Sequence, residues 1–238
     1  MNSLNLSEHT SQQFEHELED IRHKVLTMGG IVEEQVSHGL KALIEGDGTL
    51  GEEVSRNDFK VNDLEMEIDN DCNRIIALRQ PAASDLRTIV TILKLITDLE
   101  RVGDEAEKLG NIAVELATID RQPGYFTKLQ HLGNHVRKSL QDSLDAFARL
   151  DITAALATAE EDAQVDTEFE ALTRQLITYM IEDPRSIKNV LQVMWCARAL
   201  ERIGDHAKNI CEFVVFMVKG KDVRHTTIEQ LRETVYKR

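Results

Sequence analysis

One short acidic motif occurs twice in this sequence and holds the side chains best suited to chemistry. It reads LERVGD from Leu99 onward and returns 101 residues later as LERIGD from Leu200. Each copy places a glutamate and an aspartate four residues apart, so that both carboxylates share one face of a helix. The two pairs are Glu100 with Asp104 and Glu201 with Asp205. Because like charges at this spacing repel, the duplicated pair predicts that a cation binds between the carboxylates.

The same internal repeat predicts further ligands on a neighbouring helix. Four more polar side chains correspond at an offset of 104 residues: Asp58 and Asn62 match Asp162 and Asp166. Each half of the chain is therefore expected to gather four oxygen-bearing side chains. Oxygen ligands suit Mg, Ca, Mn or Fe, whereas zinc usually also takes His or Cys. We expect a divalent or transition metal ion (Mg, Mn, Fe or Zn), bound more strongly by the second set, in which all four side chains are carboxylates.

Two simpler interpretations of the acidic pairs stay open. Acidic pairs at this spacing are common on solvated helix surfaces, and Arg101 or Arg202 could neutralise them as ion pairs within a bundle. Another candidate, His131 with His135, has a spacing that can hold zinc. The sequence identifies no acidic or cysteine partner for this pair, which favours a surface location. Motifs of phosphate-binding loops, dinucleotide folds and serine hydrolases are absent from the sequence.

The elements that must position these residues are helices, because apolar residues recur at intervals of three and four along the chain. The second helix is expected to run unbroken over residues 50–79 and the fourth over 126–150. Pro81 ends the second helix, and Ser84 or Asp85 is expected to cap the third. The second half repeats this rhythm of helices and loops.

The predicted fold is therefore all-α, with two tandem, pseudo-symmetric three-helix bundles made of six long antiparallel helices. The expected units are residues 1–121, residues 122–221 and a tail of residues 222–238. The tail is less regular, and it is expected either to form a short docked helix or to stay mobile.

Composition restricts the partners and the compartment. The net charge of −14 argues against binding to nucleic acid and to an anionic membrane surface. The longest apolar run, residues 213–218, is too short to insert into a membrane. Three cysteines inside helical pattern read as core residues of a reducing compartment. A cytoplasmic location is expected, and any link to a membrane would come through a partner.

The duplicated LER-hydrophobic-GD motif, the stretch PAASDLR from Pro81 to Arg87 and the two three-helix halves resemble the PhoU family. The resemblance covers residues 3–224. It implies a cytoplasmic, often homodimeric regulator without a catalytic reaction of its own. Such proteins link the ATPase subunit of the phosphate ABC transporter to a membrane sensor histidine kinase, and they repress phosphate uptake and the phosphate-starvation response when phosphate is plentiful.

The resemblance also implies metal clusters on acidic pairs of facing helices. Carried onto this sequence, they fall on Asp58, Asn62, Glu100 and Asp104 in the first half and on Asp162, Asp166, Glu201 and Asp205 in the second. The stretch from Pro81 to Arg87 is altered in the second half, so any role of Asp85 or Arg87 belongs to one bundle only.

Two other classes of function compete with a regulator. A di-iron type of bundle enzyme usually pairs a glutamate with Glu-x-x-His motifs, and neither acidic motif has a histidine three residues after its glutamate. A purely structural bundle with acidic pairs on its surface would bind no metal. The sequence favours the non-enzymatic regulator over both.

Overall fold

The computed structural model describes residues 3–118 and 123–237 of the 238-residue chain. Within these residues all regular structure is helical, which confirms the predicted all-α class. The elements are α1 (Ser3–Glu45), α2 (Gly48–Asn57), α3 (Phe59–Arg79), α4 (Ala83–Ala117), α5 (Pro123–Arg149), α6 (Ile152–Glu182), the short 3-10 turn η1 (Pro184–Ser186), α7 (Ile187–Lys219) and α8 (Ile228–Tyr236).

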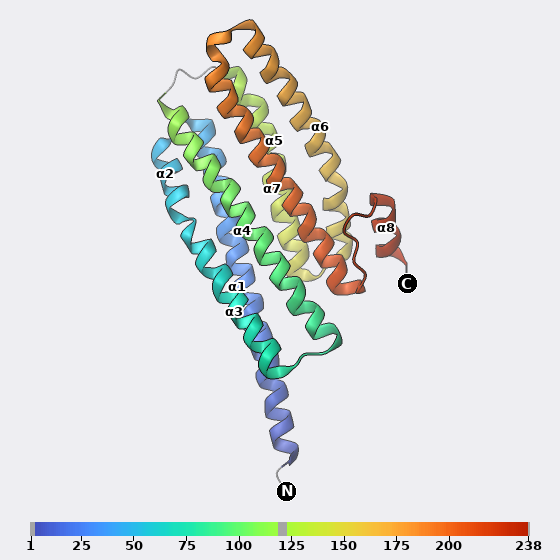
Figure 1. The fold of residues 1–238 in the computed structure, drawn as a ribbon. Coiled ribbons are helices and arrows are strands. Elements are labelled where there is room, and N and C mark those ends of the chain that lie inside the picture. Colours follow the sequence, from blue (N-terminus) through green and yellow to red (C-terminus); the bar gives the residue numbers. More distant parts are fainter. Residues whose placement is uncertain (1–2, 119–122, 238) are drawn as a thin grey trace.

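The long helices form two bundles that lie side by side (Figure 1). Helices α1 to α4 make the first bundle, and α5 to α7 make the second. Equivalent aspartates begin the second helix of each half: Asp47 accepts a hydrogen bond from the backbone N of Leu50, and Asp151 accepts from Thr153 and Ala154. These caps satisfy backbone donors that the first turn of a helix leaves free, so the repeat extends to the helix ends.

The contact between the bundles is reciprocal. Gly29 on α1 lies against Leu144 on α5, and Gly133 on α5 lies against Leu40 on α1. An offset of 104 residues converts each of these contacts into the other. Helix α4 likewise packs along α7. Such mutual contacts are those of a two-fold symmetric dimer, and the two bundles are therefore related by a pseudo-two-fold axis between α1, α5, α4 and α7.

The prediction of one unbroken helix over residues 50–79 is wrong. Helix α2 ends at Asn57 and α3 begins at Phe59, with Asp58 between them. The backbone N of Asp58 donates to the carbonyl of Ser55, three residues back, which tightens the chain at this point. The break accompanies close packing, because α2 approaches α4 more closely than larger side chains would allow.

Two glycines make that approach possible. A Cβ on Gly51 would lie 2.6 Å from the carbonyl oxygen of Gly110, and a Cβ on Gly110 would lie 2.7 Å from that of Gly51. The equivalent positions of the second half are Ala155 and Cys211, and there α6 runs unbroken from Ile152 to Glu182.

We expect Gly110→Ala to lower the free energy of unfolding by about 1–3 kcal/mol, because its methyl group would overlap a backbone carbonyl that cannot turn aside. The matched control is Gly30→Ala on α1, where no atom lies within 4 Å of an added Cβ. That change should stabilise the helix by about 0.5–1 kcal/mol. Urea denaturation of both variants measures the difference, and equal stabilities would contradict the tight α2–α4 contact.

Three smaller predictions concern the start of α4, the C-terminal tail and the boundary between the halves. Neither Ser84 nor Asp85 caps α4, whose N-cap residue is Ala82 and lacks a side-chain hydrogen bond, so that prediction is wrong. The tail forms α8, whose Leu231 and Val235 are buried and which packs on α6. The predicted boundary at residues 121 and 122 lies outside the described residues.

Candidate metal centre

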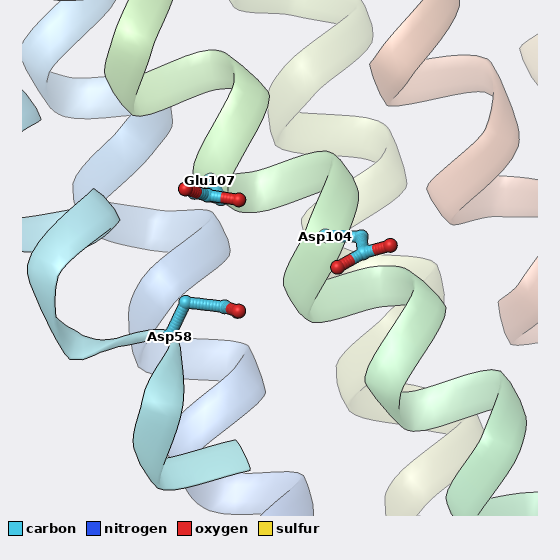
Figure 2. Close-up of side chains that lie close together, drawn as sticks. All are labelled: Asp58, Asp104 and Glu107. Atoms are coloured by element: carbon cyan, nitrogen blue, oxygen red, sulfur yellow. The ribbon is translucent and has the colours of Figure 1, made fainter. Parts of the chain in front are cut away.

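Three carboxylates from two parts of the first bundle come together. Asp58 extends from the α2–α3 junction toward α4, which carries Asp104 and Glu107 (Figure 2). One oxygen from each of these side chains lies within 4.8 Å of the others. Asp58 is buried, with 7% of its surface exposed, and the other two are half-buried. The break in the helix at Asp58 therefore occurs at a residue of the cluster.

Sequence reasoning found two of these three residues and missed Glu107. The signal was present, because Glu100, Asp104 and Glu107 follow one another at intervals of four and three on a single helix face. Asn62 lies beside this cluster and contacts Asp58. Its Nδ2 donates a 3.0 Å hydrogen bond to Oδ2 of Asp58, which holds the aspartate in place.

Burial and mutual repulsion raise the pKa values of three acidic side chains in the first half. Burial, and then the charge of Glu107, raise the pKa of Asp58 above its ordinary value. Burial, followed by Asp104 and Glu65, raises the pKa of Glu100, and the pKa of Glu65 on α3 is raised by burial, Asp69 and Asp104. Within the described residues no ion pair reaches Asp58, Glu65, Glu100, Asp104 or Glu107. These carboxylates repel one another, and the opposing charge of Arg101 is the weakest of the effects on the pKa of Glu100.

Unpartnered polar atoms surround the same point. Oδ1 of Asp58, Oδ1 of Asn62 and both amide atoms of Gln35 on α1 are buried and make no hydrogen bond in the described structure. A Cβ on Gly103 would lie 3.1 Å from Oδ1 of Asp58 and 3.5 Å from Oε1 of Gln35. Buried polar atoms without partners are costly. Their convergence beside a bare glycine backbone, next to three carboxylates, fits a bound cation.

The four predicted carboxylates of the second half act on one another electrostatically, but no three of them bring ligand atoms within 4.8 Å of one another in the described structure. Burial, followed by the charges of Asp162 and Asp166, raises the pKa of Asp205. Burial and then Asp205 raise the pKa of Glu201, and burial and then Asp162 raise that of Asp166. Asp162 and Asp166 lie on α6 and face Glu201 and Asp205 on α7.

This second cluster differs from the first because it contains its own cations. Nζ of Lys208 donates a 2.6 Å hydrogen bond to Oδ2 of Asp162, and Arg198 donates to Glu201 at 2.9 Å. Lys208 occupies the position equivalent to Glu107, at the offset of 101 residues that relates the two motifs. The expectation that the second set binds an ion more strongly stays untested, but Lys208 already offsets part of the charge of this set. The first set is the better metal candidate.

A groove of about 1120 Å³ runs between α4 and α7 and is lined by one carboxylate of each motif, Asp104 and Asp205. Arg202 pairs across it with Glu105 of the other bundle at 3.0 Å, and its charge also acts to lower the pKa of Glu201 in its own bundle. His206 and Asp98, whose side chains lie 2.5 Å apart, make a second polar link between the bundles. Two polar contacts, Arg202 with Glu105 and His206 with Asp98, thus cross the groove. The groove borders on both acidic clusters.

Glu212 in the same groove gives a pH-dependent prediction. Burial raises its pKa to about 7, against the opposing effect of Lys208. Its stabilising contribution is therefore full below the unfolded pKa of about 4.5 and is lost as the pH rises through about 7. We expect Glu212→Gln to be more stable than the parent protein at pH 8, by about 1–3 kcal/mol, with a smaller difference at pH 5. Urea denaturation at both pH values, with exposed Glu182→Gln as control, measures this; a difference independent of pH would contradict it.

Comparisons with known proteins agree with this architecture. The model of the PhoU domain matches the chain twice, over residues 25–113 and 129–214. The chain is 48% identical over 235 residues to the "phosphate-specific transport system accessory protein PhoU homolog" of Pseudomonas aeruginosa, with 99% of this chain and 97% of that protein covered. It is 49% identical over 231 residues to the "phosphate-specific transport system accessory protein PhoU" of Escherichia coli K12, with 97% and 95% covered.

Solved structures show the same fold. The crystal structure of PhoU from Pseudomonas aeruginosa superposes with a TM-score of 0.85 at 48% identity and covers 87% of this chain and 100% of that one. The phosphate transport system regulatory protein PhoU from Streptococcus pneumoniae superposes with a TM-score of 0.81 at 30% identity, with 88% and 99% covered. These relatives are named as accessory or regulatory proteins and not as enzymes. The chain, with two PhoU domains in tandem, belongs to the PhoU family of phosphate-transport accessory and regulatory proteins.

Proposed function

We propose that this chain represses phosphate uptake and the phosphate-starvation response from the cytoplasm. It would do so by linking the ATPase subunit of the phosphate ABC transporter to a sensor histidine kinase, as a homodimer that reaches the membrane only through these partners. The proposal is supported by two relatives named for phosphate transport that share nearly half of their residues with this chain over almost its full length. A protein named as a phosphate transport system regulator, 30% identical to this chain, has the same fold. No helix in the described part of the chain has the length and apolarity of a membrane span.

We further propose that the first acidic cluster binds a divalent cation when the protein works. Asp58, Asp104 and Glu107 would hold the ion, with Glu100 beside them and Asn62 orienting Asp58. All donors are oxygens, which favours Mg²⁺, Mn²⁺ or Fe²⁺ over Zn²⁺. The observation that carries this proposal is the meeting of three carboxylates with an unpartnered buried oxygen of Asp58, without a cation of the chain among them.

The second set of Asp162, Asp166, Glu201 and Asp205 has a different role in this proposal. Its lysine takes the place of an ion, so this set would bind added metal weakly and would keep α6 and α7 together at all metal concentrations. Only the first bundle would then change with the metal. In this account the ion, when bound, removes repulsion between α4 and the α2–α3 junction and so fixes the surface that a partner recognises.

The test measures binding of the purified ATPase subunit and of the cytoplasmic part of the kinase by biolayer interferometry. The binding of each partner is measured in Mn²⁺ and, separately, in EDTA. Both the parent protein and Asp58→Asn/Asp104→Asn are tested. We expect binding to both partners, weakened by EDTA and by the double substitution. Failure to bind either one of them would contradict the linking role. Equal affinity with and without metal would contradict the role of the ion and leave the linking role standing.

A further inference from the structure

The second bundle carries a cluster of nitrogen and oxygen ligands that is separate from both acidic clusters. His131 and His135 lie one turn apart on α5, and both face Glu168 on α6. Nδ1 of His131 is 3.2 Å from Oε2 of Glu168, and Nδ1 of His135 is 3.3 Å from Oε1. The histidine pair had no identifiable acidic partner in the sequence, and the packing of α5 on α6 supplies one.

Each imidazole lies near Glu168 at a spacing close to that of a tetrahedral metal site, but the ligand atoms of all three residues do not yet lie within 4.8 Å of one another. Ligand bonds of about 2.0–2.2 Å to Zn²⁺ place neighbouring ligand atoms about 3.3–3.5 Å apart. The nitrogen–oxygen distances of 3.2 and 3.3 Å are hydrogen-bond contacts, one just below that range and one at its lower limit. The two imidazoles contact opposite oxygens of one carboxylate, so an ion shared by all three residues requires one imidazole to turn. The side chain of His131 is 73% exposed and is free to do so.

The groups around this cluster hold it in position for a ligand role. Nε2 of Gln164 donates to Glu168 at 3.2 Å, and Oε2 of Glu161 lies 3.9 Å from Nε2 of His135, the ring nitrogen that faces away from Glu168. A histidine that binds zinc usually has a carboxylate or carbonyl behind its other nitrogen. The lysine one turn further along α5, Lys138, pairs with Asp142.

We propose that His131, His135 and Glu168 form a zinc site that cross-links α5 and α6, with a fourth position open to water. Nitrogen ligands make it selective for Zn²⁺ and similar transition metals, whereas the all-oxygen cluster of the first bundle suits harder ions. The site belongs to the second half alone, because the equivalent positions of the first half are Thr27, Ile31 and Leu64.

The experiment titrates Zn²⁺ into Asp58→Asn/Asp104→Asn protein by calorimetry, and Co²⁺ into the same protein with visible absorption as the readout. That background removes the first acidic cluster. We expect one Zn²⁺ per chain and the intense spectrum of tetrahedral Co²⁺. Adding His131→Ala should weaken Zn²⁺ binding at least about tenfold and abolish the Co²⁺ spectrum. This side chain is largely exposed, so the variant should fold, as circular dichroism will show.

The matched control is His16→Ala/His23→Ala, which removes two exposed histidines of α1 and should change neither readout. Failure of the background protein to bind Zn²⁺ would overturn the proposal. Zn²⁺ binding of equal affinity with and without His131 would overturn it as well. Neither outcome would bear on Mn²⁺ binding by the first acidic cluster, which is measured separately in the parent protein.

Discussion

Lys208→Glu is expected to give the chain a second bound cation. The substitution places a carboxylate at the position where the first half has Glu107, and it removes the ammonium group that now pairs with Asp162. The acids left on α6 and α7 would then repel one another as those of the first bundle do. In EDTA we expect the variant to lose about 1–3 kcal/mol of stability, a range that allows for the 37% exposure of the Lys208 side chain. Saturating Mn²⁺ should restore most of that loss.

Native mass spectrometry in the presence of Mn²⁺ measures the effect, with an expected rise from one ion per chain to two. The matched control is Lys188→Glu, which makes the same change of charge at an exposed position of α7. It should keep the stoichiometry of the parent protein. An unchanged ion count in Lys208→Glu would mean that its ammonium group is not what distinguishes the two clusters.

Asp58→Asn/Asp104→Asn is expected to abolish Mn²⁺ binding at the first cluster and to stabilise the metal-free protein. Both changes keep the shape of the side chain. Each removes a negative charge from a group of carboxylates whose oxygens lie within 4.8 Å of one another and repel. Relief of that repulsion should add about 1 kcal/mol or more to the free energy of unfolding in EDTA at pH 7.5. The parent protein should instead be the more stable of the two in saturating Mn²⁺. Urea denaturation in both conditions measures this reversal of order.

The pH dependence provides the internal check. Because the pKa values of Asp58 and Glu100 are raised in the fold, the native protein binds more protons than the unfolded chain. The metal-free parent should therefore become more stable as the pH falls from 7.5 toward the ordinary carboxyl range, and the double variant should show a shallower dependence. Asp63→Asn, which removes an exposed charge of α3, is the control and should match the parent in every condition. A double variant that binds Mn²⁺ as the parent does would show that these residues are not the ligands.

The helices and their repetition could be predicted because apolar spacing directly reflects which face of a helix is buried. The acidic motif could be found for the same reason, since duplication and helical spacing are both properties of the sequence. Glu107 was also within reach, as the next acid on the face that carries Glu100 and Asp104. Aligning the two halves at the offset of 101 residues also places Lys208 opposite Glu107, so this difference between the halves could be read from the sequence as well.

Other features depend on contacts between distant segments and could not be predicted in this way. The break at Asp58 has no proline or glycine beside it, and it accompanies the close packing of Gly51 against Gly110. The pairing of His131 with Glu168 joins residues 37 positions apart on two helices. Local propensity carries no information about either contact, because both are fixed by how the helices pack.

A crystal structure of the parent protein grown with Mn²⁺, with data collected at the Mn absorption edge, would locate the bound ion directly. We expect one anomalous peak per chain within the first cluster, coordinated by oxygens of Asp58, Asp104 and Glu107. We expect no peak between Asp162 and Asp205, where Lys208 already supplies positive charge. A peak in the second cluster with the first one empty, or no peak in either at saturating Mn²⁺, would contradict the proposed metal site.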